Sequence, residues 1–184
     1  GELTQKDGQD TTHLNVVDKN GNVASITHSL GQYSGVVTPG LGFIYNNGMA
    51  RFDPRPGHAS SLVPRKARIH LMMPTIVFKD AHPAIVLGAP GGNSILSGLV
   101  QVLINVVDFD MKAVEAVTVP RIHAEGNTIW CEARTRVDIC EALRERGYNV
   151  IQDPASLSGQ IARVQLVIIR PDGSLDGGSD LRGP

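Results

Sequence analysis

An alternating segment near the start of the chain predicts a β-hairpin. Apolar and polar residues alternate over 12–17, and a second alternating segment follows over 23–29. Between them stands the turn sequence Asp18-Lys19-Asn20-Gly21, in which Asn-Gly favours the backbone conformation of a tight hairpin turn. The hairpin places Thr11 at the head of its first strand, because Thr11 directly precedes the alternating residues.

Thr11 is the candidate nucleophile of this segment. A threonine hydroxyl needs a base to take its proton, and a threonine at a chain terminus carries that base as its own α-amino group. A free α-amino group has a reference pKa of about 7.7–8.0, so part of it is unprotonated near neutral pH. Ten residues precede Thr11 here, so this chemistry requires cleavage of the Asp10–Thr11 bond. The alternative is a β-branched residue that simply opens a strand, the commonest use of threonine.

The composition excludes several classes of protein. The 184 residues suit one domain with a sizeable core, which we expect over 11–184. The net charge of −1 without a basic stripe argues against nucleic acid, and no apolar run approaches a membrane span. Cys131 and Cys140 form neither a disulfide framework nor a metal pattern and are interpreted as buried or idle thiols. The histidines lack a ligand spacing such as His-x-x-x-His, so we predict no metal, and we expect no cofactor.

The order of elements predicts a layered α+β fold. Residues 1–10 are polar and are interpreted as a flexible lead or a precursor remnant. Glycines and prolines predict loops over 30–41 and 53–66. Beyond the hairpin, strands are predicted over 43–45, 72–78, 84–88, 127–132, 161–169 and 174–178, and helices over 93–107, 111–118 and 135–147. Strands dominate both ends and helices the middle, a segregation typical of layered α+β proteins.

Several motifs along the chain together resemble one enzyme family. The chain resembles the small subunit of the γ-glutamyltranspeptidases, which are N-terminal-nucleophile hydrolases, from Thr11 nearly to its end. The motifs that carry the resemblance are Thr11-Thr12-His13 with Val16-Val17-Asp18-Lys19, Gly40-x-Gly42-Phe43-Ile44-Tyr45-Asn46-Asn47, Met73-Pro74-Thr75-Ile76-Val77, Gly88-Ala89-Pro90-Gly91-Gly92, Pro120-Arg121-Ile122-His123, Pro171-Asp172-Gly173-Ser174-Leu175 and Gly178-Ser179-Asp180-x-Arg182.

The resemblance implies a fold, a maturation step and a partner. It implies the four-layer αββα sandwich, with part of it supplied by a large subunit that is not in this chain. It also implies a precursor that cuts itself before Thr11 into the two subunits. A processed subunit would have lost any signal peptide with its large subunit, so the compartment stays open.

The resemblance also assigns roles to the residues near Thr11. Ser29 takes the place of a threonine whose hydroxyl supports the nucleophile; its alternative reading is a solvated strand serine. Gly91 and Gly92 match the glycine pair of the oxyanion hole. Glycines at a helix start allow a close approach of backbone N–H groups to an acyl oxygen, each donor being worth roughly 3 kcal/mol. The alternative is an ordinary strand-to-helix turn with Asn93 or Ser94 as the cap.

Departures from the family pattern bear on the substrate. Gly31 replaces an asparagine that contacts the substrate's α-amino group, Arg51 replaces the acid that pairs with it, and His70-Leu71 replaces a serine pair that contacts its carboxylate. Two like charges about 4 Å apart cost roughly 4 kcal/mol at a partly screened site, so Arg51 disfavours a γ-glutamyl ammonium. Arg51 favours an anion instead, unless it turns outward as surface arginines usually do.

Further side chains complete the predicted substrate site. Arg68 and His70 lie on a segment that matches pocket residues, and Asn47 lies in the Asn-Asn motif just before Arg51. We therefore expect Asn47, Arg51, Arg68 and His70 to bind the substrate.

The sequence thus predicts an autoprocessed threonine amidohydrolase or acyltransferase that cleaves a small-molecule amide through an acyl-enzyme. An anionic acyl amide, as in oxamate amidohydrolases, or a β-lactam side chain, as in cephalosporin acylases, fits Arg51 better than glutathione. One alternative is a true γ-glutamyltranspeptidase or glutathione hydrolase. An alternative of another class is a catalytically dead binding subunit, against which the retained Thr11, Ser29, Gly91 and Gly92 argue.

Overall fold

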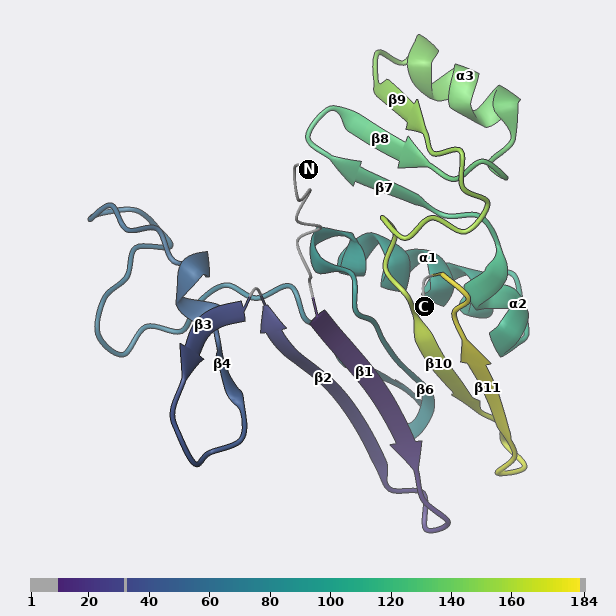
Figure 1. Ribbon diagram of the computed structural model, residues 1–184. Helices are drawn as coiled ribbons and strands as arrows, with labels where there is room; N and C mark the ends of the chain where they lie inside the picture. Colours follow the sequence, from purple (N-terminus) through teal and green to yellow (C-terminus); the bar gives the residue numbers. More distant parts are fainter. Residues whose placement is uncertain (1–9, 32, 183–184) are drawn as a thin grey trace.

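A computed structural model describes residues 10–31 and 33–182 of the chain (Figure 1). The predicted lead over 1–10 lies outside the described residues except for Asp10, which is the first residue of strand β1. Within the described ranges, no helix is long and apolar enough to cross a membrane.

The predicted hairpin is confirmed. Strand β1 (Asp10–Val17) pairs antiparallel with β2 (Val23–Gly31), and the register sets Thr11 opposite Ser29. The carboxylate of Asp18 closes the turn by accepting hydrogen bonds from the backbone N–H groups of Asn20 at 2.8 Å and Asn22 at 2.9 Å. Gly21 adopts a φ of 82°, the left-handed conformation that an Asn-Gly turn supplies without strain.

A four-stranded antiparallel sheet forms the centre of the molecule. Its order is β11-β10-β6-β5, with β5 at Thr75–Lys79, β6 at His82–Gly88, β10 at Gln165–Ile169 and β11 at Leu175–Ser179. All four strands fall inside or beside predicted segments. The segments over 72–78 and 161–169 were predicted to begin three and four residues too early, since β5 begins only after Pro74 and 161–164 stay outside the sheet.

The central sheet is covered on both faces (Figure 1). Helices α1 (Ile95–Val107) and α2 (Ala113–Thr118) pack on one face, where Leu87, Leu99 and Leu166 belong to the main hydrophobic core. The β1–β2 hairpin packs on the other face, against β6 and β10. The chain therefore supplies a sheet, a second sheet and a helical layer in that order.

A smaller unit follows the two helices. Strands β7 (Ile122–Glu125) and β8 (Thr128–Cys131) pair antiparallel, and β9 (Asn149–Gln152) joins β8 in parallel after helix α3 (Val137–Glu145). Of these elements, β8 and α3 were predicted from the sequence, whereas β7 and β9 were not, because their residues lack the apolar run seen in β8. Cys131 on β8 and Cys140 on α3 are both buried and form no disulfide. The interpretation of these cysteines as buried thiols is confirmed.

The predicted loop over 30–41 was wrong for its first part and right for residues 38–41. Strand β2 extends to Gly31, and β3 (Tyr33–Val37) pairs with β4 (Ile44–Asn46). Gly31 and Gly35 take positive φ within extended segments, and the strand pairing is irregular beside each of them: between Asp10 and Thr11 in the β1–β2 pair, and between Tyr33 and Val37 in the β3–β4 pair. The long loop over 53–66 is confirmed; it follows the short 3-10 helix η1 (Gly48–Arg51) and holds only a single bridge between Asp53 and Ser61.

Four buried charged side chains join the C-terminal segment to the rest of the fold. Arg182 donates to Glu132 at 2.6 Å and 2.7 Å and to Asp180 at 3.0 Å, and Arg121 donates to the other oxygen of Asp180. All four side chains have no exposed surface. Two guanidinium groups and two carboxylates cancel in charge, which is the condition for burying them.

Large apolar side chains remain exposed on two outer faces. Leu14, Val16 and Ile26 are about half exposed on the outer face of the hairpin. Leu96, Val100, Ile104 and Val107 are similarly exposed on the outer face of α1. Exposed apolar faces of this extent are typical of surfaces covered by a partner.

We therefore expect the isolated chain to be insoluble or molten and to fold only with the large subunit that the family resemblance implies. The physical reason is that both outer faces would otherwise leave apolar side chains in water. The measurement is calorimetry of the purified chain alone, compared with calorimetry of the chain co-expressed with that large subunit. A cooperative thermal transition of the isolated chain would contradict the prediction.

Candidate active site

Thr11 stands at the end of β1 with its side chain on the inward face of the hairpin. Its hydroxyl lies 2.8 Å from the hydroxyl of Ser29, its cross-strand neighbour on β2. The Ser29 oxygen also accepts a hydrogen bond from the backbone N–H of Gly31 at 2.9 Å. Ser29 can thus hold its own proton toward Thr11 while its oxygen is fixed from behind, an arrangement that restrains the Thr11 oxygen.

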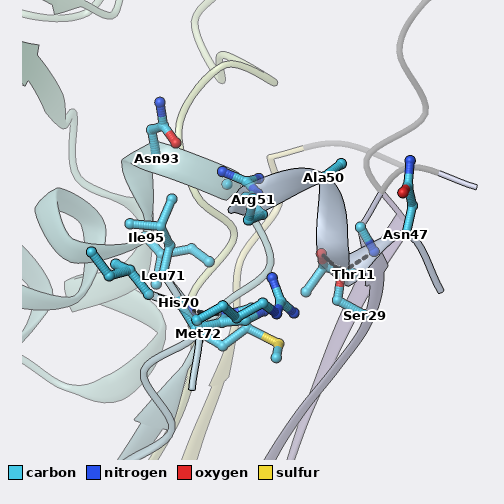
Figure 2. A pocket seen from close by; sticks show the side chains of 15 residues that line it. Thr11, Ser29, Asn47, Ala50, Arg51, His70, Leu71, Met72, Asn93 and Ile95 are labelled. Atoms are coloured by element: carbon cyan, nitrogen blue, oxygen red, sulfur yellow. Dashed lines mark hydrogen bonds between the residues drawn. The ribbon is translucent and has the colours of Figure 1, made fainter. Parts of the chain in front are cut away.

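The hydroxyl pair opens into a pocket of about 330 Å³ (Figure 2). Three segments distant in sequence complete its wall: residues around η1, the extended segment 68–72, and the turn that leads into α1. The apolar part of the wall consists of Ala50, Ile69, Leu71, Met72 and Ile95. A pocket formed where several segments meet, part polar and part apolar, is typical of a small-molecule site.

The structure brings together nearly all of the predicted site residues. Those that line the pocket are Thr11, Ser29, Asn47, Arg51, Arg68, His70 and Gly92. Gly91 precedes Gly92 directly in the chain but does not itself line the pocket. Arg51 lines the pocket but is also exposed to solvent, so its alternative reading as a surface arginine stays open (Figure 2).

The turn after β6 requires glycine at Gly91. Its φ of 149° is rare for residues with a side chain, and an added Cβ would lie 2.4 Å from the Cα of Ala162. The backbone N–H of Arg163 donates to the carbonyl of Pro90 at 2.9 Å, which holds the two segments together. Gly92 has a φ of 57° and begins the one-turn 3-10 helix η2 (Gly92–Ser94) that leads into α1.

The alternative reading was an ordinary strand-to-helix turn capped by Asn93 or Ser94. The turn is present, but neither side chain caps the helix. The hydroxyl of Ser94 donates to the carbonyl of Gly91 at 2.8 Å, so it stabilises the turn rather than capping the N–H groups of α1. The side chain of Asn93 donates to Glu125 at 3.1 Å instead. The turn therefore directs backbone toward the pocket without a side-chain cap from Asn93 or Ser94.

The electrostatics of the pocket are one-sided. Arg51 and Arg68 line it, and none of the described residues that line it is an aspartate or a glutamate. Burial lowers the pKa of His70 below its ordinary value, and the nearby Arg68 and Arg51 lower this pKa further. Nδ1 of His70 accepts a hydrogen bond from the backbone N–H of Met72 at 2.9 Å, which leaves the proton of the neutral ring on Nε2. The site therefore offers positive charge and a neutral donor to an anion.

The side chains beneath Thr11 were not predicted from the sequence to belong to the site. His13 and Asn15 follow it on the inward face of β1, and Ser25 and Thr27 face them from β2. Burial lowers the pKa of His13, while its hydrogen bond with Asn15 raises it by a smaller amount. The alternation of Thr11, His13 and Asn15 along the strand shows that these polar side chains share one face. It does not show that this face is buried.

Comparisons with known proteins bear on the whole chain. The family model described as γ-glutamyltranspeptidase matches residues 1–184. The chain is 37% identical over 177 residues to the "Acylase ACY 1 proenzyme" of Pseudomonas sp. (strain V22), covering 95% of this chain and 31% of that protein. It is 32% identical over 200 residues to the "Glutathione hydrolase proenzyme" of Escherichia coli (strain K12), covering 99% of this chain and 33% of that protein.

Solved structures give the same result. The chain matches a γ-glutamyltranspeptidase from Pseudomonas nitroreducens with a TM-score of 0.81 and 33% identity, over 94% of this chain and 96% of that one. It matches a cephalosporin acylase from Bacillus halodurans with a TM-score of 0.84 and 32% identity, over 92% of this chain and 32% of that one.

These matches settle the fold and the family. The sheet, second sheet and helical layer are parts of the four-layer αββα sandwich of the N-terminal-nucleophile hydrolases. The chain spans about a third of the length of the two curated relatives, which are both named proenzymes. The chain therefore belongs to the γ-glutamyltranspeptidase family, whose members include acylases and glutathione hydrolases.

Proposed function

We propose that this chain is the catalytic small subunit of an autoprocessed threonine amidohydrolase that acts on an anionic acyl amide. The observation that carries the proposal is the Thr11–Ser29 hydroxyl pair, 2.8 Å apart, in a pocket lined by Arg51 and Arg68 without an acid among its described lining residues.

The reaction follows from the position of Thr11. Its hydroxyl oxygen attacks the amide carbonyl, the α-amino group freed by cleavage of the Asp10–Thr11 bond takes the hydroxyl proton, and the amine leaves with a proton. A water molecule then attacks the acyl ester, releases the carboxylic acid and restores Thr11. Ser29 restrains the Thr11 oxygen through their hydrogen bond and is a supporting group rather than a base.

The oxyanion of both steps requires hydrogen-bond donors beside the attacked carbonyl. We assign this role to the Gly91–Gly92 turn, because Gly92 and Thr11 line the same pocket and the turn carries backbone N–H groups at a helix start.

Arg51 and Arg68 define the class of acyl group. An acyl chain that ends in a carboxylate can pair with a guanidinium in two parallel hydrogen bonds, whereas a γ-glutamyl ammonium would be repelled. His70 and the amide of Asn47 add neutral donors to the same wall.

A true γ-glutamyltranspeptidase or glutathione hydrolase is the second candidate. The 32% identity to the glutathione hydrolase proenzyme over 99% of this chain favours it. The higher identity to the acylase proenzyme and the arginine pair favour the acylase-like reading.

Thr11→Ala should leave the precursor as one uncut band on a gel, because the oxygen that attacks the preceding carbonyl is gone. Thr12→Ala is the matched control, since Thr12 is exposed on the opposite face of the same strand and should not affect cutting. Normal cutting of Thr11→Ala would remove Thr11 from the mechanism.

Gly92→Val should lower kcat strongly while the fold survives. At a φ of 57° a β-branched residue is strained, so the turn must shift and move its N–H groups away from the acyl oxygen. Loss of one oxyanion donor costs about 10²–10³ in kcat. Steady-state kinetics with a melting curve measures both effects. Activity within a few-fold of the parent would mean that the glycine is merely structural.

Charge reversal at Arg51 tests the substrate class. Arg51→Asp should lose most activity toward oxamate or a glutaryl amide, because the carboxylate of the acyl group then meets a like charge. Arg65→Asp is the matched control, since Arg65 is exposed outside the pocket and aspartate tolerates its positive φ of 61°. The measurement is kcat/KM for γ-glutamyl anilide, oxamate and a glutaryl amide on the processed parent and both variants. If γ-glutamyl anilide is clearly the best substrate of the parent, the second candidate is correct.

A further inference from the structure

A buried polar layer separates the β1–β2 hairpin from the central sheet directly beneath Thr11. At its centre lies His13, whose side chain is bonded on both sides: Nδ1 lies 2.8 Å from the Thr27 hydroxyl and Nε2 lies 2.8 Å from Oδ1 of Asn15. The amide nitrogen of Asn15 donates to the carbonyl of Gln165 on β10 at 3.0 Å. The ring is therefore tied to both strands of the hairpin and, through Asn15, to the central sheet.

These bonds fix one orientation of the ring. Because the Asn15 nitrogen donates to Gln165, its oxygen must accept, so Nε2 of His13 donates and Nδ1 accepts from the Thr27 hydroxyl. A buried network in which each group has a directional partner specifies a single arrangement, whereas apolar side chains between two sheets can slide.

The ring is seated on the backbone of β6. A Cβ added at Gly88, the last residue of β6, would lie 2.1 Å from Cε1 of His13 and 2.5 Å from both ring nitrogens. Such distances leave no room for any side chain at position 88. The distance between β1 and β6 at this point is thus determined by the contact of the His13 ring with the Gly88 backbone, which carries no side chain.

This contact lies between the two parts of the proposed catalytic machinery. On one side, Thr11 precedes His13 by two residues on the same face of β1. On the other side, Gly91 and Gly92 follow Gly88 by three and four residues, and Gly91 is held in place by its close fit to Ala162. A change in the spacing at Gly88 therefore moves the nucleophile relative to the turn.

We propose that His13 is a positioning residue that, seated on Gly88, sets the distance between the Thr11 hydroxyl and the Gly91–Gly92 turn. His13 does not line the pocket and takes no part in proton transfer. This inference rests on the function proposed above. Misplacement of reacting groups by about 1 Å costs on the order of 10²-fold in rate, so a small change of spacing is enough to be measured.

The test uses size exchange at the contact. The full-length precursor is made with Gly88→Ala, with His13→Ser, and with both changes. Gly178→Ala is the matched control, because its added Cβ would also crowd backbone, at 2.5 Å from the Ala113 oxygen, on the far side of the central sheet. Three quantities are measured: the rate of Asp10–Thr11 cleavage, kcat and KM of the processed enzyme on the best of the three substrates above, and the melting temperature.

Gly88→Ala should slow both cleavage and kcat by about ten- to a hundredfold with KM within about threefold, since binding groups other than the turn are untouched. If Gly88→Ala lowers kcat a hundredfold, the kcat of the double variant should be at least tenfold higher than that of Gly88→Ala. The reason is that serine at position 13 leaves free the space that the new methyl group needs. Gly178→Ala should lose melting temperature and keep both rates.

Two results would overturn the proposal. One is a Gly88→Ala enzyme that melts at a lower temperature, as Gly178→Ala does, but keeps its kcat. The contact would then contribute to packing and stability only. The other is a double variant whose rate is the product of the two single effects, which means that ring and glycine do not act on each other.

His13→Leu keeps the proposal testable if Gly88→Ala does not fold. Leucine fills the space without the hydrogen bonds and should lower kcat at least tenfold with KM nearly unchanged; a kcat within threefold of the parent refutes the positioning role. Thr11→Ala separates this failure from that of the proposed function. If Thr11→Ala is cut and active, the proposed function is wrong, whereas an inactive Thr11→Ala beside a fully active Gly88→Ala refutes only the role of His13.

Discussion

Much of the rest of the structure depends on the hydrogen bonds that the buried guanidinium of Arg182 donates. It donates to both oxygens of Glu132, to Asp180, and to the carbonyls of Val117 and Val119. These partners belong to the small three-stranded unit, the C-terminal segment and the end of α2. An unpaired charge in this place would cost several kcal/mol, so the three parts are stable only in their joint arrangement.

The same cluster reaches the wall of the pocket through a short series of contacts. Asp180 accepts a hydrogen bond from the backbone N–H of Val164 at 2.9 Å, and Arg163 next to it donates to the carbonyl of Pro90 at 2.9 Å. Ala162 packs so closely on Gly91 that no side chain fits there. Residues at the C-terminal end of the chain thereby support the turn beside Thr11.

The pocket combines a family framework with an individual charge pattern. The hydroxyl pair and Gly92 line one pocket, in a fold that matches those of a γ-glutamyltranspeptidase and a cephalosporin acylase. Arg51, Arg68 and His70 give this framework a positive wall, and the pKa of His70 is lowered by burial and by those arginines. In the function proposed above, the framework supplies the chemistry of acyl transfer and the positive wall selects the charge of the acyl group.

The sequence by itself determined the hairpin, the helices and most of the strands, because period and turn residues are local signals, and its motifs pointed to seven of the residues that line the pocket. It did not predict β3, β7 or β9, which lack a clear apolar alternation and take strand geometry by pairing with neighbours. Only the tertiary structure decided which polar residues are buried: His13 on Gly88, and Arg182 on Glu132. Each of these contacts joins residues at least 50 positions apart, and alternation shows that two side chains share a face but not what that face meets.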